Sequence, residues 1–193
     1  MSQDFTTTRD RLYFPFLSGF YNSFAQPVGW LAFRIIIGGM LAYEGWNKVQ
    51  NPMGLAGFVE NLGIGPGWFF SPLIAVTNFV GGLLIVFGVL TRPAALANAI
   101  MLLVTYWFHV THPYGDAFLT PAGIEYLNAN TDLLTGAGQR QLLADGGARF
   151  LSSPTGVQLK AELNSLFWTA GAAIIAALGG GKLSVDRMMR KEF

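Results

Sequence analysis

Residues 61–91 read NLGIGPGWFFSPLIAVTNFVGGLLIVFGVLT and contain no Asp, Glu, Lys or Arg. Such a stretch has room for a helix of about 20 residues, which is the length that crosses roughly 30 Å of hydrocarbon. Because hydrocarbon offers no partner to unpaired backbone groups, a helix is the structure that this stretch favours. It therefore predicts a membrane-spanning helix at about 69–90.

The same pattern recurs along the chain. The stretches 93–115 and 163–181 also lack charged residues, and the earlier apolar run at 28–49 contains only three of them. No series of alternating ten-residue segments suggests a membrane β-barrel. We therefore predict an all-α fold, an integral membrane four-helix bundle, with spans at about 27–49, 69–90, 93–112 and 163–181.

The composition supports this environment. Charged residues make up 12% of the 193 residues, hydrophobic residues make up 52%, and the mean hydropathy is +0.42. A soluble domain has about 25% charged residues, so the lipid bilayer is the expected surrounding of this chain. The net charge of +1 excludes a nucleic-acid partner bound through bulk charge. The absence of cysteine excludes disulfides, thiol catalysis, iron–sulfur clusters and Cys-ligated zinc.

The connections between the spans differ in length. Asn51-Pro52 ends the first span and starts a short helix at about 53–62, which we expect to lie at the membrane interface. Thr91-Arg92-Pro93 leaves only a tight turn, so the second and third spans should form an antiparallel hairpin. The polar segment 113–162 is a long loop inserted between the third and fourth spans.

The distribution of Lys and Arg predicts the orientation. With four spans, both termini and the 91–92 turn share one side of the membrane, which then carries Arg9, Arg11, Arg92, Lys182, Arg187, Arg190 and Lys191. The opposite side carries Lys48, Arg140, Arg149 and Lys160. The positive-inside rule therefore places both termini in the cytoplasm and 113–162 outside. We expect a cytoplasmic arm at 1–26, without the features of a cleavable signal peptide, and a transmembrane domain at 27–188.

Polar residues within the spans are the best functional clues, because burying them in a bilayer is unfavourable. Arg34, Gly38, Leu41, Gly45 and Lys48 follow one another at helical spacing and form a single stripe. Its glycines should allow a neighbouring helix to approach closely, with Arg34 facing that helix or a wet cleft. We expect structural roles for Arg34, for Asn78 in the second span and for Asn98 in the third.

A second group of polar residues is expected at the outer ends of the spans. Glu44 and Lys48 are spaced as a same-helix ion pair. The third span presents His109 and His112 at the same depth, and the fourth presents Asn164. Such a group suits the polar head of a quinone, so the predicted ligand-binding residues are Glu44, Asn47, Lys48, His109, His112, Asn164 and Trp168. The alternative is an ordinary interfacial belt of Trp, Tyr and His.

No catalytic residue and no metal site can be named from the sequence. The two His, three apart on one helix, are the only ones in the chain, and no Cys accompanies them. Nothing resembles a phosphate-binding loop, a Ser-His-Asp constellation or a nucleotide fingerprint. Quinone is therefore the one cofactor that the sequence suggests.

Three motifs resemble those of the DoxX-like family of small bacterial membrane proteins. They are RIIIG at 34–38 with EGWNK at 44–48, NFVGGLL at 78–84 with GVLTR at 88–92, and GGGKLSVD at 179–186. The resemblance implies a four-helix bundle in the bacterial plasma membrane, and relatives include the DoxD component of thiosulfate:quinone oxidoreductase. Two positions depart from the pattern. Glu44 stands where relatives often have His, and Asn78 stands where a Glu usually precedes the double glycine, which weakens a proton-transfer role at that position.

Two functions follow as hypotheses. The first is a membrane subunit of a quinone-linked oxidoreductase that acts beside a partner subunit holding the redox centre. The second is a scaffold or assembly factor without catalytic activity, which recruits a soluble partner through the loop 113–162. A redox subunit should co-purify with quinone, whereas a scaffold should carry only bulk lipid. A secondary transporter is disfavoured because the sequence has neither an inverted repeat nor a pair of interrupted helices.

Overall fold

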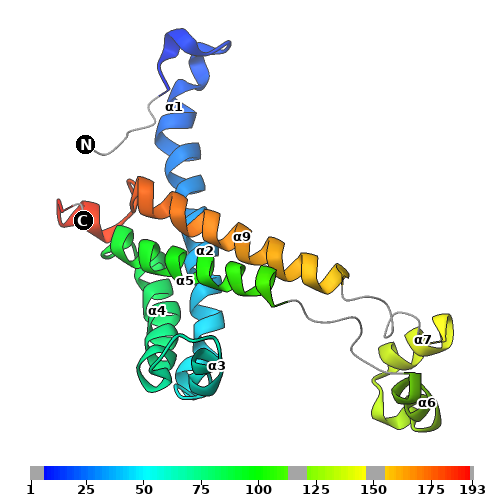
Figure 1. Cartoon of the computed structure of the whole chain (residues 1–193). Helices are drawn as coiled ribbons and strands as arrows, with labels where there is room; N and C mark the ends of the chain where they lie inside the picture. The colour runs from blue at the N-terminus through cyan, green and yellow to red at the C-terminus, as the bar shows by residue number, and fades with distance from the viewer. Residues whose placement is uncertain (1–6, 113–120, 147–154, 192–193) are drawn as a thin grey trace. The chain divides into compact units, whose positions relative to one another are not determined.

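The computed structural model describes residues 7–112, 121–146 and 155–191, and every regular element in those ranges is helical (Figure 1). Four helices in the described residues are long and apolar enough to cross a membrane: Pro15–Gln50, Gly67–Phe87, Thr91–Thr111 and Leu159–Leu178. The prediction of an all-α integral membrane helical bundle is therefore confirmed.

The long helices are α2 (Gln26–Gln50), α4 (Gly67–Phe87), α5 (Thr91–Thr111) and α9 (Thr155–Leu178). The shorter elements are η1 (Arg9–Arg11), η2 (Pro15–Leu17), α1 (Ser18–Phe20), the π-helical η3 (Tyr21–Ala25), α3 (Ala56–Asn61), α6 (Pro121–Ala129), η4 (Thr131–Leu133), α7 (Gly136–Asp145) and α10 (Val185–Met188). A short helix thus follows the first span where the sequence predicts one.

Two helix boundaries differ from the predicted spans for identifiable reasons. Helix α4 ends at Phe87 instead of about 90, because Gly88 adopts a left-handed conformation (φ 72°) and its N–H bonds back to the Leu84 carbonyl at 2.8 Å. Helix α9 begins at Thr155 instead of about 163. Hydropathy marks the apolar part of a helix and not the polar turns that precede it.

The chain divides into two compact units, Met1–Leu103 with Phe167–Phe193 and Val104–Leu166. In the first unit, α2 and α4 pack tightly in antiparallel directions. A Cβ atom at Gly38 would lie 2.7 Å from the Gly82 carbonyl oxygen, and one at Gly45 would overlap the backbone of Phe79. Gly38, Gly45 and Gly82 are all buried. The absence of side chains at these positions is therefore what lets the two backbones meet.

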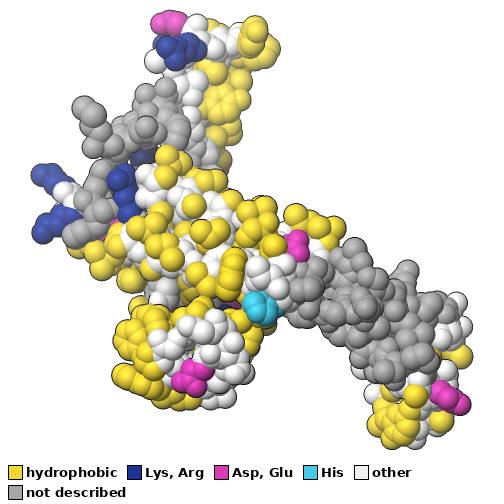
Figure 2. Space-filling view, in the orientation of Figure 1, with side chains coloured by type: hydrophobic (Ala, Val, Ile, Leu, Met, Phe, Trp, Pro, Cys, Tyr) yellow, Lys and Arg dark blue, Asp and Glu magenta, His cyan; other side chains and the backbone are white. Residues whose placement is uncertain are grey.

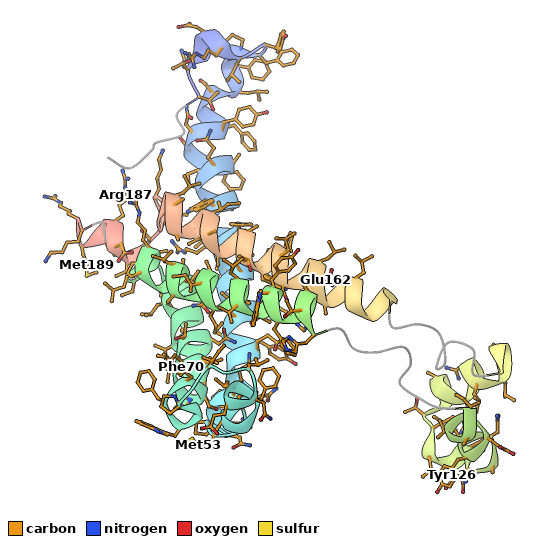
Figure 3. The ribbon with its side chains drawn as sticks, in the orientation of Figure 1. Met53, Phe70, Tyr126, Glu162, Arg187 and Met189 are labelled. Carbon is orange, nitrogen blue, oxygen red and sulfur yellow. The ribbon has the colours of Figure 1, made fainter. Side chains whose placement is uncertain are left out.

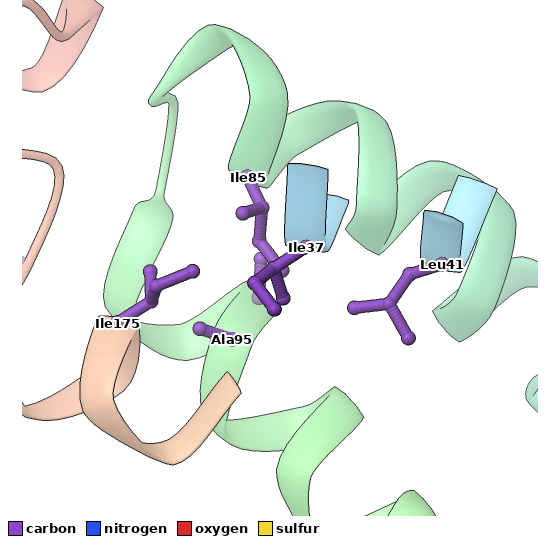
Figure 4. Packing of buried hydrophobic residues seen from close by; sticks show 6 residues of the cluster. Ile37, Leu41, Ile85, Ala95 and Ile175 are labelled. Atoms are coloured by element: carbon purple, nitrogen blue, oxygen red, sulfur yellow. The ribbon is translucent and has the colours of Figure 1, made fainter. Parts of the chain in front are cut away.

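The core of the first unit takes residues from all four long helices (Figure 4). Ile37 and Leu41 come from α2, Ile85 from α4, Ala95 from α5 and Ile175 from α9, and each is at most 3% exposed. Small alanines on α5 and branched residues on the other helices fill this cluster, against which Trp30, Phe33 and Trp168 also pack.

The start of α4 is held by the preceding short helix. The Glu60 carboxylate of α3 accepts a hydrogen bond from the Gly67 N–H at 2.9 Å. The Ser71 hydroxyl donates to the Pro52 carbonyl at 2.5 Å and accepts from the Leu55 N–H at 3.2 Å. These bonds fix the turn that returns the chain to α4, since the first N–H groups of a helix have no partner within it.

The second unit contains α6, η4 and α7, which lie around the labelled Tyr126 in Figure 3. Ile124 of α6 and Leu142 of α7 are buried. The Thr135 hydroxyl caps α7 by accepting from the Gly138 N–H at 3.3 Å, and the Gln139 amide donates to the Thr131 carbonyl at 2.8 Å. The described part of the predicted polar loop is therefore mostly helical.

Apolar side chains cover much of the outer surface of the long helices, as Figure 2 shows. Exposed examples on four different helices include Ile36, Val76, Ile100 and Ile174. A surface of this kind suits lipid and not water. The lipid bilayer is thus the partner that the structure supports.

Candidate functional site

The glycine stripe of α2 begins with a buried arginine. Arg34 is 1% exposed. One terminal nitrogen of its guanidinium donates to the Gly180 carbonyl, and the other donates to the carbonyls of Leu183 at 2.7 Å and Val86 at 3.3 Å. Arg34 therefore joins α2 to the last turn of α4 and to the segment that follows α9.

That segment, residues 179–186, is here named the C-terminal clasp. The Trp30 indole N–H donates to the Gly179 carbonyl at 3.0 Å, and the Ser184 hydroxyl donates to the Gly181 carbonyl at 2.8 Å. A Cβ atom at Gly180 would lie 2.6 Å from the Cβ of Ser184, so the turn has no room for a larger residue there. The three consecutive glycines thus bring backbone carbonyls within reach of Trp30 and Arg34.

Asp186 closes the clasp on the turn between α4 and α5. Its carboxylate accepts hydrogen bonds from the Leu90 N–H at 2.8 Å, the Thr91 N–H at 2.9 Å and the Thr91 hydroxyl at 2.6 Å. Its own N–H donates to the Gly88 carbonyl at 2.9 Å. A carboxylate at a helix N-terminus satisfies N–H groups that the helix leaves free and interacts favourably with the helix dipole.

Arg34 and Asp186 also interact through their charges. Transfer of an unpaired arginine to the centre of a membrane helix costs about 2.5–3.5 kcal/mol. In this chain the guanidinium instead meets three carbonyls and a nearby carboxylate, and Asp186 is only 6% exposed. The terminal nitrogens of Arg34 and the carboxylate of Asp186 are occupied by hydrogen bonds that hold the helices together. We therefore assign Arg34 and Asp186 a structural role and not a reactive one.

Sequence reasoning missed the role of Asp186. The signal was present, because a buried arginine in a membrane helix calls for an opposite charge, and Asp186 follows a glycine-rich turn at the matching end of the bundle. Distance along the chain concealed the relationship, since only folding brings 34 and 186 together.

Asn78 and Asn98 lie inside the first unit, 3% and 0% exposed. The Asn98 amide donates to the Thr77 carbonyl of α4 at 3.0 Å and to the Ala94 carbonyl of α5 at 2.9 Å, and it sits against Gly81. Asn98 therefore joins α4 to α5. In the described part of the chain, neither side-chain carbonyl oxygen has a hydrogen-bond partner.

Three of the predicted ligand-binding residues occupy the last two turns of α2. Glu44 and Asn47 are exposed, and Lys48 is half-buried. Glu44 and Lys48 influence one another electrostatically across one turn. Among the described residues, none of these three side chains forms a hydrogen bond or an ion pair within 4 Å, and the adjacent Trp46 ring packs on Phe79 of α4 at 5.4 Å between centroids. The arrangement leaves an ammonium, an amide and a carboxylate available beside an aromatic surface.

The other predicted ligand-binding residues are divided between the two units. Trp168 belongs to the first unit and packs against its core cluster. His109, His112 and Asn164 belong to the second unit. The His112 ring stacks on Phe108 at 5.0 Å and its Nδ1 contacts the Thr111 hydroxyl at 2.8 Å, while Asn164 is exposed on α9. That these residues share a site with Glu44 and Lys48 stays a prediction.

Comparison with known proteins agrees with this architecture. Residues 29–111 match the DoxX family model, a region that runs from α2 to the end of α5. The chain is also similar to Inner membrane protein YqjF of Escherichia coli (strain K12), with 39% identity over 85 residues, which is 44% of this chain and 64% of the relative. The alignment thus spans less than two thirds of that relative's length. No solved structure gives a significant match.

The residues that match the DoxX model include those of the α2–α4 glycine contacts and the Asn98 bridge. Similarity to an inner membrane protein and four helices of membrane-spanning character indicate a multi-pass protein of the bacterial inner membrane. The chain is therefore an integral membrane protein whose residues 29–111 are similar to the DoxX family model.

Proposed function

We propose that the chain is the membrane subunit of a quinone-linked oxidoreductase, with a quinone-head site at the outer end of α2. The observation that carries the proposal is a contrast between two sets of charged residues in the first unit. Arg34 and Asp186 are buried and used in hydrogen bonds. Glu44 is exposed and Lys48 half-buried, and among the described residues neither side chain forms a hydrogen bond or an ion pair within 4 Å.

The proposed site fits the chemistry of a quinone. The two ring carbonyls accept hydrogen bonds, and the Lys48 ammonium and Asn47 amide are donors. The Glu44 carboxylate is placed to exchange protons, and the Trp46–Phe79 pair offers an aromatic surface to the ring. Reduction to a quinol takes two electrons and two protons. We assign the electrons to a partner subunit that holds a redox centre.

The orientation belongs to the same proposal. The basic residues near the termini place both termini in the cytoplasm, so the end of α2 that carries Glu44 and Lys48 faces the outside.

The test is quinone content after purification in a mild detergent. The wild-type protein should retain extractable quinone, and Glu44→Gln and Lys48→Gln should each lose most of it. Asp10→Asn is the matched control, because it removes an exposed carboxylate in η1, far from Glu44 and Lys48 in the chain. The proposal is contradicted if the wild type and the three variants have equal quinone contents, no higher than the bulk lipid carries.

The second candidate is a scaffold that recruits a soluble partner through 113–162. The observation that favours it is the folded helical segment of the second unit, which exposes Tyr126 and Leu133 at 61% each and Leu143 at 83%. Co-purification of a protein that is lost in Leu143→Ser, with quinone at the bulk level, would support the scaffold over the quinone subunit.

A further inference from the structure

The first membrane helix is longer than a membrane requires. The continuous helical stretch Pro15–Gln50 has 36 residues, or about 54 Å at 1.5 Å per residue, against roughly 30 Å of hydrocarbon. Trp30 and Arg34 bind the C-terminal clasp just beyond the end of α9, and Arg34 also reaches the last turn of α4. The other helices therefore end level with Trp30 and Arg34, and the helical turns before Trp30 extend beyond them.

This extension is rich in exposed aromatic side chains. Tyr13 is 100% exposed and Phe16 is 77% exposed, and the same holds to a lesser degree for Phe14, Phe20, Tyr21 and Phe24. Isolated exposed apolar residues need no explanation, but six of the twelve residues 13–24 are aromatic, and together they form a patch. Such a patch is unfavourable in water, so an apolar phase or surface should cover it.

The chain before the helix folds back along it. The Asn22 side chain bonds the Thr7 backbone in both directions, accepting from its N–H at 2.8 Å and donating to its carbonyl at 2.9 Å, and the Gln26 amide donates to the Thr7 hydroxyl at 2.9 Å. This arrangement, here named the N-terminal hook (residues 7–25), carries Arg9 and Arg11 beside the aromatic residues.

More basic residues adjoin the N-terminal hook from the C-terminal side. The Lys182 ammonium donates to the Asn22 carbonyl at 3.4 Å. The exposed Arg187, Arg190 and Lys191 follow it in the chain. Among the described residues of this segment, the acidic one is Asp186, and its carboxylate already accepts hydrogen bonds from Leu90 and Thr91. The end of the first unit that carries the hook therefore combines accessible aromatic rings with an excess of positive charge.

We propose that the N-terminal hook is an interfacial anchor for anionic phospholipid. In this arrangement the aromatic rings of residues 13–24 lie among the headgroups and upper acyl chains, and Arg9 and Arg11 bind lipid phosphates. Aromatic rings beside basic side chains are the composition that favours a membrane interface, and anionic lipid attracts basic residues placed next to a span. The hook is also continuous with a membrane-spanning helix, so the bilayer is the surface nearest to it.

The chain contains no cysteine, so single cysteines can carry a spin label without interference. We would label Phe16→Cys and Phe24→Cys in vesicles of phosphatidylethanolamine and phosphatidylglycerol. Collisions with oxygen report lipid exposure, and collisions with an aqueous nickel chelate report water exposure. Ile100→Cys, 57% exposed on α5, is the lipid-facing reference, and Asn61→Cys at the end of α3 is the polar reference.

The expected oxygen-to-nickel ratio at both hook positions lies between those of Asn61→Cys and of Ile100→Cys, which is near the middle of α5, and is several-fold above that of Asn61→Cys. Adding Arg9→Gln and Arg11→Gln, or replacing the lipid by phosphatidylcholine alone, should lower the ratio. A ratio equal to that of Asn61→Cys overturns the proposal. A ratio that changes neither with the charge of the lipid nor with the substitution of the two arginines also overturns it. Spin–spin broadening that disappears on dilution with unlabelled protein would show that a second copy covers the patch, and this too overturns it.

Discussion

Arg34 and Asp186 bind neighbouring parts of the same turn between α4 and α5. Arg34 donates to the Val86 carbonyl in the last turn of α4, and Asp186 accepts from the Leu90 and Thr91 N–H groups where α5 begins. The last carbonyls of one helix and the first N–H groups of the next lack partners within their own helices. One cation and one anion supply these partners and place α2, α4, α5 and the C-terminal clasp together.

The first prediction concerns this pair. Asp186→Asn removes the negative charge that faces Arg34 and weakens the bonds to Leu90 and Thr91. Hydrogen bonds to a charged group contribute about 1.5–3 kcal/mol, so we expect a loss of stability on the order of 2 kcal/mol. The measurement is reversible unfolding in mixed micelles. Asp10→Asn, at an exposed position, should leave stability unchanged, and a similar result for both variants would contradict the structural role of Asp186.

The second prediction concerns the contact between α2 and α4. Gly38→Ala places a Cβ atom 2.7 Å from the Gly82 carbonyl oxygen and 2.9 Å from the Val86 nitrogen, so the helices must separate. Overpacking of this kind costs about 1–3 kcal/mol. Gly39→Ala is the matched control, because a Cβ atom there meets nothing within 4 Å. Thermal stability in detergent should fall for Gly38→Ala alone, and equal values for the two variants would argue against the close α2–α4 contact.

The third prediction concerns the bridge between α4 and α5. Asn98→Leu keeps the approximate shape of the side chain but loses the hydrogen bond to the Thr77 carbonyl. Hydrogen bonds between membrane helices contribute about 0.6 kcal/mol on average and up to about 1.7 kcal/mol, so a modest destabilisation in that range is expected. The measurement is the free energy of unfolding, and the reference is Ala97→Leu, a substitution at the neighbouring exposed position. A stabilising effect of Asn98→Leu would show that the bridge contributes nothing.

Much of the fold could be predicted from the sequence. The helix length that a bilayer imposes leaves few alternatives for charge-free stretches, and this located all four spans. Helix ends were less predictable, because they depend on local features such as the left-handed Gly88 and on polar turns such as those before Leu159. The helical turns between Pro15 and Gln26 were likewise hidden within a segment predicted only as an arm.

The candidate site was predictable in part. A stripe that combines one arginine with glycines follows from spacing on a single helix, so the shared face of Arg34, Gly38 and Gly45 could be predicted from the sequence alone. The contacts of Asp186 could not, because its partners lie on α2 and at the α4–α5 turn, far away in the chain. Glu44 and Lys48 were expected as an ion pair from their spacing, but among the described residues their side chains interact across one turn without forming that pair within 4 Å.

The accessibility of single cysteines in intact cells decides the orientation on which the quinone site depends. With both termini in the cytoplasm, the C-terminal clasp lies inside and the end of α2 that carries Glu44 and Lys48 lies outside. In the cysteine-free chain, Asn61→Cys beside that outer end should react with a membrane-impermeant maleimide in intact cells. Met188→Cys, 82% exposed in α10, should react only after the membrane is opened. The reverse pattern, or equal labelling of both positions from outside, would contradict the proposed orientation and with it an outward-facing quinone site.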